Sequence, residues 1–196
     1  MSATLISIIG PPAAGKTTLA EKLVAVLGGR MIREDFAGNP FLADSYMGRA
    51  EACLPAQLYY LMSRVTQLSC VAWPDDGVSV SDYGFCQDAL YAHTKLDGED
   101  LALYERVAAR LAPLIKTPDL VLHVDASVVT MRRRIVQRGR EFERTFTDDF
   151  LSTMRTRYKD IVRSLTCPVI AVDGDVTNFR HVSKVDPLVA EIRAAL

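Results

Sequence analysis

The chain alternates short apolar runs with longer segments in which apolar residues recur every three or four positions. Short apolar runs bounded by turn residues are typical of buried strands, and the longer period is typical of amphipathic helices. The predicted strands span 4–9, 30–33, 78–81, 119–124 and 168–172. The predicted helices span 15–27, 54–72, 99–111, 128–138, 148–165 and 187–195, with Ser127 as the N-cap of the fourth.

Strands that alternate with helices need crossover connections, which give a parallel sheet covered on both faces. We therefore predict a single α/β domain over 1–196, with a five-stranded parallel sheet and helices on both faces. Ligands of such sheets bind at the carboxyl ends of the strands. Candidate functional residues are accordingly those that directly follow a predicted strand.

Of the 196 residues, 49% are hydrophobic and 24% are charged, as in an average globular domain. This composition excludes a disordered chain, a fibre or a coiled coil. A formal net charge of −1 argues against a protein that coats nucleic acid or anionic membrane. The four cysteines lack metal-ligand spacing and are expected to be reduced thiols. No secretory signal and no apolar run of membrane-spanning length is visible, so we expect a cytoplasmic protein without nucleic-acid or membrane partners.

A glycine-rich segment between the first predicted strand and helix has the spacing G-x-x-x-x-G-K-[ST]. Backbone N–H groups of such a loop cradle phosphate oxygens, the lysine reaches the β- and γ-phosphates, and the hydroxyl that follows ligates Mg²⁺. The segment therefore predicts binding of ATP and Mg²⁺, with Thr17 as a metal ligand. Its residues are Gly10, Pro11, Pro12, Ala13, Ala14, Gly15, Lys16, Thr17 and Thr18.

Three acidic residues follow the second and third strands. Glu34 is placed to take a proton from an acceptor hydroxyl, but a solvated loop acid is an equal alternative and Asp35 is equally eligible. Asp82 suits a Mg²⁺ ligand beside Thr17, or else a turn or N-cap aspartate. Position alone leaves each of these alternatives open.

Gln57 and Arg64 stand seven residues apart and so share one face of the predicted 54–72 helix. A glutamine amide can pair with a nucleobase edge, and Arg64 can be held by a carboxylate such as Asp88. The alternative is a polar stripe on a surface helix.

Arginines cluster around Gly139 at the end of the predicted 128–138 helix. Such a cluster suits a lid, here at about 134–146, that closes over transferring phosphates. The alternative is a solvated basic helix end, which the helix dipole favours. The cluster consists of Arg134, Arg138, Arg140 and Arg144.

Taken together, these residues resemble the deoxynucleoside kinases, the family of deoxyadenosine, deoxyguanosine, deoxycytidine and thymidine-2-type kinases. Beyond the phosphate-binding loop, the resemblance is carried by EDFAGNPFL at 34–42, QLYYLMSR at 57–64, and PDLVLHVDAS at 118–127 leading to RIVQRGREFE at 134–143. It covers nearly the whole chain and implies a P-loop NTPase fold of the nucleoside-kinase type. It also implies transfer of the ATP γ-phosphoryl group to the 5′-hydroxyl of a deoxynucleoside, and a homodimer formed through the 54–72 and 99–111 helices.

The resemblance assigns roles to individual residues. Glu34 matches the base for the 5′-hydroxyl, and Gln57 matches the residue that hydrogen-bonds the nucleobase. Tyr46 and Glu143 match the pair that holds the sugar 3′-hydroxyl. The catalytic lid arginines of the family match Arg134, Arg138 and Arg140. The loop at 173–179 is expected to meet the donor adenine.

Arg64 and Asp88 match a base-side pair of members that take purine deoxynucleosides or deoxycytidine. An aspartate can accept a hydrogen bond from an exocyclic amino group, which thymine lacks. The pair therefore favours a purine deoxynucleoside or deoxycytidine over thymidine, and it does not rank adenine, guanine and cytosine.

One position departs from the family pattern. Asp82 is kept, but Tyr83 stands where many members carry an arginine that contacts the catalytic base and the phosphates. We expect Arg33 or a lid arginine to compensate. The departure keeps a second hypothesis open, a nucleotide-binding regulator with impaired catalysis. A nucleoside monophosphate kinase is a third, but it needs acceptor-side arginines and no base, which Glu34 and Gln57 argue against.

The neutral total conceals a separation of charge along the chain. Residues 75–105 carry a net charge of −7, and residues 131–163 carry +5. The basic segment contains the predicted lid and the acidic one contains Asp82 and Asp88. This distribution suits a site for a small polyanion and its metal ion.

Overall fold

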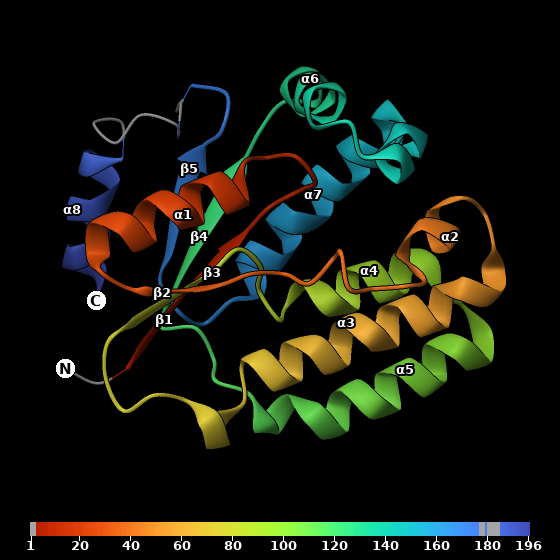
Figure 1. Ribbon diagram of the computed structural model, residues 1–196, viewed down its shortest axis with the longest axis horizontal. Helices are drawn as coiled ribbons and strands as arrows, with labels where there is room; N and C mark the ends of the chain where they lie inside the picture. The colour runs from red at the N-terminus through yellow and green to blue at the C-terminus, as the bar shows by residue number, and fades with distance from the viewer. Residues whose placement is uncertain (1–2, 177–178, 180–184) are drawn as a thin grey trace.

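A computed structural model describes residues 3–176, 179 and 185–196 of the chain (Figure 1). Its five strands form one sheet in the order β2-β3-β1-β4-β5, and every neighbouring pair is parallel. The predicted five-stranded parallel sheet is confirmed. The strands are β1 (Thr4–Ile9), β2 (Arg30–Ile32), β3 (Val78–Ser81), β4 (Leu120–Asp125) and β5 (Val169–Asp173).

Helices connect the strands and cover the sheet. The α-helices are α1 (Lys16–Leu27), α2 (Leu42–Tyr46), α3 (Cys53–Gln67), α4 (Gln87–Lys95), α5 (Gly98–Leu111), α6 (Val128–Arg138), α7 (Asp148–Ser164) and α8 (Asp186–Ala195). The 3₁₀ turns are η1 (Ala50–Ala52), η2 (Cys70–Ala72), η3 (Ala112–Leu114) and η4 (Glu141–Thr145). No helix within the described residues is long and apolar enough to cross a membrane.

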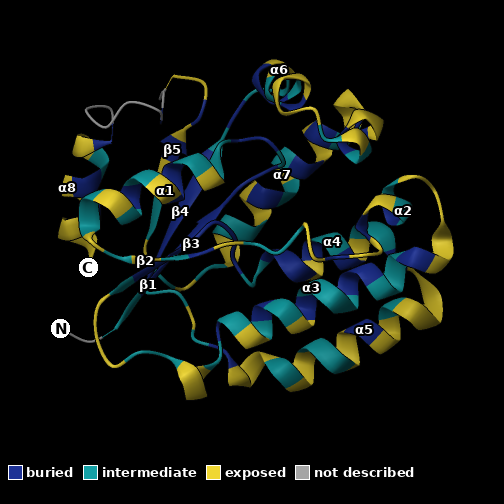
Figure 2. Ribbon diagram, in the orientation of Figure 1, coloured by how far each residue is buried: buried dark blue, intermediate teal, exposed yellow. Residues whose placement is uncertain are grey.

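Alternate residues of the central strand face opposite layers of the core, as the strand period requires. Ile6 and Ile8 pack in one cluster with Leu19 of α1, which lies beside α8. Ile9 packs in another cluster with Met154 and Tyr158 of α7. Figure 2 shows the strands buried between these helices, so the prediction of helices on both faces is confirmed.

The local signals of the sequence explain most element boundaries. Ser127 caps α6, because its Oγ accepts from the N–H of Thr130 at 3.3 Å, and Gly139 ends the helix with a φ of 67°. The predicted 54–72 helix is shorter than expected, since α3 ends at Gln67 and the 3₁₀ turn η2 follows. Helices α2 and α4 were not predicted, and α4 lies beside α3 in Figure 1.

Candidate active site

The phosphate-binding loop links β1 to the N-terminus of α1. A side chain at Gly10 is excluded, because a Cβ atom there would lie 2.2 Å from the carbonyl oxygen of Val124. Lys16 folds back over its own loop and donates from Nζ to the carbonyl oxygens of Gly10 at 2.8 Å and Pro11 at 3.1 Å. Burial lowers the pKa of Lys16 to about 8. The loop thus has the strand–loop–helix context that a phosphate site needs, with its lysine inside the site.

Asp82 joins the phosphate-binding loop to the chain after β2. Its Oδ2 accepts from the Thr17 hydroxyl at 2.6 Å, and its Oδ1 accepts from the backbone N–H of Glu34 at 2.8 Å. Asp82 is therefore not the cap of a helix. Burial raises the pKa of Asp82, while the bonds from Thr17 and Glu34 oppose that rise. The side-chain oxygens of Thr17 and Asp82 are hard ligands that suit Mg²⁺, so the donor set agrees with the predicted metal site.

Glu34 faces the same cavity as Lys16 and Asp82. Its Oε1 forms an ion pair with Nη2 of Arg64 and accepts from Nε2 of Gln87 at 2.9 Å. The neighbouring Asp35 points elsewhere: it accepts from the Tyr59 hydroxyl and from the backbone N–H of Gly38, and it does not line the cavity. Of the two acids left open by the sequence, Glu34 is the one that lines the cavity.

Arg64 is the arginine that pairs with Glu34 in this chain, where Tyr83 interrupts the family pattern. The expectation that Arg33 or a lid arginine would hold Glu34 is wrong, because Arg33 pairs with Glu21 at 2.8 Å and the ion pair to Glu34 comes from Arg64. The Tyr83 ring is fully buried, with its centroid 5.3 Å from Cζ of Arg64. Tyr83 thus packs against the guanidinium group that forms the ion pair with Glu34.

The predicted pairing of Arg64 with Asp88 is present, and it is buried. Nη1 of Arg64 forms an ion pair with Oδ1 of Asp88, and each side chain is only 4% exposed. Burial raises the pKa of Asp88 to about 6, against the opposing influence of Arg64. Asp88 lies behind Arg64 and does not line the cavity, so a direct contact between Asp88 and a bound base is not formed by this geometry.

The cavity between the phosphate-binding loop and helices α2, α3 and α4 measures about 260 Å³. Gln57 of α3 lines it and is 5% exposed. Sequence reasoning did not find several of the lining residues, since an isolated aromatic or amide side chain carries no spacing signal. They are Phe36, Tyr60, Gln87, Tyr91, Phe142 and Phe146.

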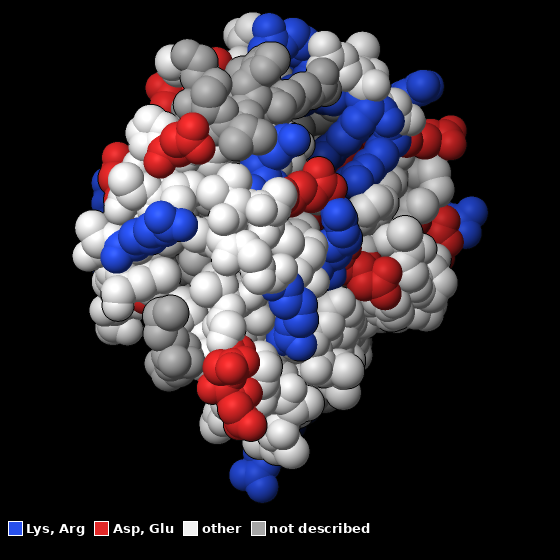
Figure 3. All heavy atoms as spheres, turned by 60° about the vertical axis from the view of Figure 1, so that its left-hand side comes forward, with Lys and Arg blue, Asp and Glu red and all other residues white. Residues whose placement is uncertain are grey.

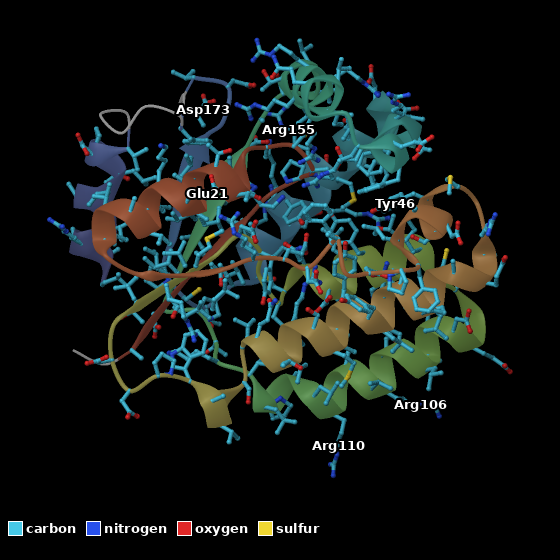
Figure 4. All side chains as sticks on the ribbon, viewed as in Figure 1. Glu21, Tyr46, Arg106, Arg110, Arg155 and Asp173 are labelled. Carbon is cyan, nitrogen blue, oxygen red and sulfur yellow. The ribbon has the colours of Figure 1, made fainter. Side chains whose placement is uncertain are left out.

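Tyr46, labelled in Figure 4, comes from α2 and packs against the segment that follows Gly139. Its ring lies 5.7 Å from that of Phe142 and 4.9 Å from that of Phe146. The ammonium group of Lys95 lies 3.7 Å from the centre of the Tyr46 ring. Burial raises the pKa of Tyr46, and the negative charge of Glu143 adds to that rise. Tyr46 and Glu143, the predicted pair, both line the cavity, although no direct hydrogen bond joins the two side chains.

Two of the predicted lid arginines converge on Glu143. Arg138 forms a two-point ion pair with the Glu143 carboxylate, and Arg140 reaches the same carboxylate at 3.3 Å. Glu143 is 2% exposed, and Cζ of Arg140 also lies 3.6 Å from the ring centre of Phe36. All three charged side chains line the cavity beside the phosphate-binding loop.

Arg134 lies apart from the other two arginines. Nη1 of Arg134 donates to the carbonyl oxygen of Ala14 and Nη2 to that of Gly174, both at 2.6 Å. It thereby joins the phosphate-binding loop to the loop after β5. In that second loop Phe179 packs on Gly15, while Thr177 and Asn178 of the predicted adenine contact lie outside the described residues.

The carboxylate at the end of β4 is already engaged. Asp125, the last residue of β4, forms an ion pair with Arg155, which Figure 4 labels, and Lys159 lies 3.4 Å from it. These cations lower the pKa of Asp125. Figure 3 shows Lys and Arg side chains gathered in a band on one face of the molecule, with acidic side chains among them.

Comparison with known proteins gives a consistent result. The family model described as deoxynucleoside kinase matches residues 6–195. A deoxyguanosine kinase of Bacillus subtilis is 30% identical over 186 residues, covering 91% of this chain and 90% of the relative. A deoxyadenosine kinase of Dictyostelium discoideum is 29% identical over 180 residues, covering 88% and 73%. A structure of deoxyadenosine kinase from M. mycoides with dCMP and dCDP bound has the same fold, with a TM-score of 0.83, 19% identity and coverage of 97% and 99%.

Proposed function

The chain belongs to the deoxynucleoside kinase family, and we propose from that membership that it transfers the γ-phosphoryl group of ATP to the 5′-hydroxyl of a purine deoxynucleoside or of deoxycytidine. The observation that carries the proposal is the placement of Glu34 in one cavity with Lys16 and Thr17 of the phosphate-binding loop. A carboxylate within reach of the phosphate site can accept a proton from an attacking hydroxyl.

In the proposed reaction the 5′-oxygen forms a bond to the γ-phosphorus as the bond between that phosphorus and the β,γ-bridging oxygen breaks. Glu34 takes the proton of the 5′-hydroxyl, and ADP leaves with the bonding electron pair. Lys16, Arg138 and Arg140 stabilise the charge that is spread over the transferred group. Thr17 and Asp82 would hold Mg²⁺, which neutralises phosphate charge when bound.

The acceptor end of the cavity supports the proposed substrate. Gln57 offers both a donor and an acceptor to a base edge. Arg64 lies at the cavity wall with Asp88 behind it, so we propose that Asp88 acts on the base by fixing the direction of the guanidinium group. Tyr46 and Glu143 are the proposed holders of the sugar 3′-hydroxyl.

The names of the relatives support a purine deoxynucleoside or deoxycytidine as the substrate. Two are named deoxyguanosine kinase in Bacillus subtilis and deoxyadenosine kinase in Dictyostelium discoideum, and another in Bacillus subtilis is named deoxyadenosine/deoxycytidine kinase. A monophosphate acceptor is less well supported, because two carboxylates already neutralise Arg64, the arginine of α3 at the cavity wall. Turnover with ATP and Mg²⁺ is to be compared for each natural deoxynucleoside, each ribonucleoside and deoxyadenosine monophosphate.

Replacing the proposed base tests the mechanism. Glu34→Gln should lower kcat about 100- to 10,000-fold, because a general base contributes a factor of that order, while ATP binding measured by calorimetry stays nearly intact. Asp35→Asn is the matched control, since Asp35 is the adjacent acid and does not line the cavity. Unchanged turnover in Glu34→Gln would remove Glu34 from the role of base. Nucleotide binding without turnover of any nucleoside in the unaltered protein would favour the regulator.

The homodimer implied by the family is also a proposal. Met62 of α3 and Leu103 of α5 are large apolar side chains that stay 49% and 39% exposed, which supports an interface on these helices. Sedimentation equilibrium of the purified protein measures its mass in solution. A monomeric mass at micromolar concentration would contradict the proposal.

A further inference from the structure

A buried amide side chain in the cavity wall hydrogen-bonds to Glu34. Gln87, the first residue of α4, is 2% exposed, and its Nε2 donates to Oε1 of Glu34 at 2.9 Å. A hydrogen bond donated to a carboxylate is stronger than one between neutral groups. Gln87 is therefore in a position to affect where the Glu34 carboxylate points.

The surroundings of Gln87 fix the orientation of its amide. Its Oε1 accepts from the Tyr158 hydroxyl at 3.3 Å and from the backbone N–H of Gly84 at 3.4 Å. The backbone N–H of Gly84 can only donate and the Glu34 carboxylate can only accept, so the amide oxygen faces Gly84 and the nitrogen faces Glu34. Tyr158 is fully buried and hydrogen-bonds in turn with Tyr91, which makes its hydroxyl part of a packed network.

Arg64 and Gln87 both bind the same oxygen of Glu34. Nη2 of Arg64 and Nε2 of Gln87 converge on Oε1, and no hydrogen bond joins Oε2 to another described residue. The Glu34 side chain is 25% exposed, in contrast to the 4% of Arg64. Two donors from different helices thus hold one oxygen and leave the other for a proton donor in the cavity.

We propose that Gln87 is a positioning residue that orients the Glu34 carboxylate so that Oε2 accepts the proton of the attacking hydroxyl. Arg64 supplies the opposite charge, but its guanidinium is shared with Asp88. Gln87 has no such competing partner for its Nε2 among the described residues, so it sets the direction of the carboxylate. The inference rests on the proposed role of Glu34 as base.

Gln87→Met is the informative variant, because methionine keeps the length and loses the donor. Loss of one hydrogen bond to a charged group should lower kcat about 10- to 100-fold, with little change in the KM of either substrate. Thr94→Val is the matched control on the same helix, since Thr94 bonds to the Leu90 carbonyl and to Arg157 of α7 and does not line the cavity.

A structural readout that does not depend on catalysis separates this inference from the proposed function. Crystal structures of the unaltered protein, of Gln87→Met and of Thr94→Val are compared at the Glu34 side chain. The carboxylate should change its orientation only in Gln87→Met. If the unaltered protein turns over no deoxynucleoside, the proposed function fails while this comparison still decides the role of Gln87.

A Glu34 carboxylate that keeps its orientation in Gln87→Met, or a loss confined to KM, would overturn the inference. If Gln87→Met does not fold, Tyr158→Phe replaces it, because the variant keeps the buried ring and removes one of the hydrogen bonds that hold the amide. A smaller loss of kcat at unchanged KM supports the proposal, and an unchanged kcat in Tyr158→Phe refutes it.

Discussion

Replacing Arg64 by methionine should destabilise the fold strongly, because it leaves two carboxylates next to each other without their shared cation. Asp88 is 4% exposed at its side chain and Glu34 is 25% exposed, so most of the cost comes from Asp88. Breaking a buried ion pair from one side costs about 3–5 kcal/mol. At about 2–4 °C per kcal/mol for a chain of this size, Tm should fall on the order of 10 °C.

The loss should depend on pH in a defined direction. The pKa of Asp88 is already raised to about 6 by burial, and it rises further when the Arg64 charge is removed. At pH values between the pKa of an ordinary aspartate and the raised pKa of Asp88 in the variant, Asp88 is protonated in the folded variant and ionised in the unfolded chain. The variant therefore gains stability as pH falls, and its deficit should be smaller at pH 5 than at pH 8.

Urea unfolding followed by circular dichroism measures this deficit at both pH values. The double variant Arg64→Met/Asp88→Leu is the control, because replacing a whole buried pair by apolar side chains is often neutral. It should recover most of the lost free energy. A single variant within about 1 kcal/mol of the unaltered protein at pH 8, or a double variant no more stable than the single one, would refute the reasoning.

Two further predictions concern the phosphate-binding loop. Burial lowers the pKa of Lys16 to about 8, so its amine loses its charge as pH rises through about 8. The affinity for ATP, measured by calorimetry, should fall over the same range. An ATP affinity that does not change with pH would contradict this. Arg134→Lys should weaken ATP binding and lower Tm by a few degrees, because one ammonium group cannot span the carbonyl oxygens of Ala14 and Gly174 as two guanidinium nitrogens do. Unchanged ATP affinity and Tm would show that the bridge between these loops is dispensable.

The sequence predicted the elements whose signals are local. Each strand was placed within one residue at either end, and the Ser127 cap and the Gly139 stop bound α6 as expected. Helix α4 was missed because its nine residues mix buried polar and apolar side chains without a clear period. The strand order also lay beyond reach, because nothing local in β1 indicates that β3 and β4 are its neighbours.

Within the site, position along the chain found candidates but not their partners. Glu34 and Asp35 are both acids after one strand, and only the fold shows that Asp35 turns toward Tyr59. The double contact of Asp82 was equally hidden, since its partners are 65 and 48 residues away. Gln87 carried no signal at all, because one glutamine at the start of an unpredicted helix belongs to no recognisable spacing.

The hydrogen bonds from Arg64 and Gln87 to Glu34 have a consequence for how specificity for the acceptor can evolve or be engineered. The proposed base follows a strand, while the residues proposed to face the acceptor come from the helices between the strands. Arg64 of α3 and Gln87 of α4 belong to those helices, yet they hold the carboxylate that follows β2. Substitutions that reshape α3 or α4 for a new nucleobase should therefore also move the proposed proton acceptor. Libraries that vary these helices but keep Arg64 and Gln87 should retain more active members than libraries that vary every position.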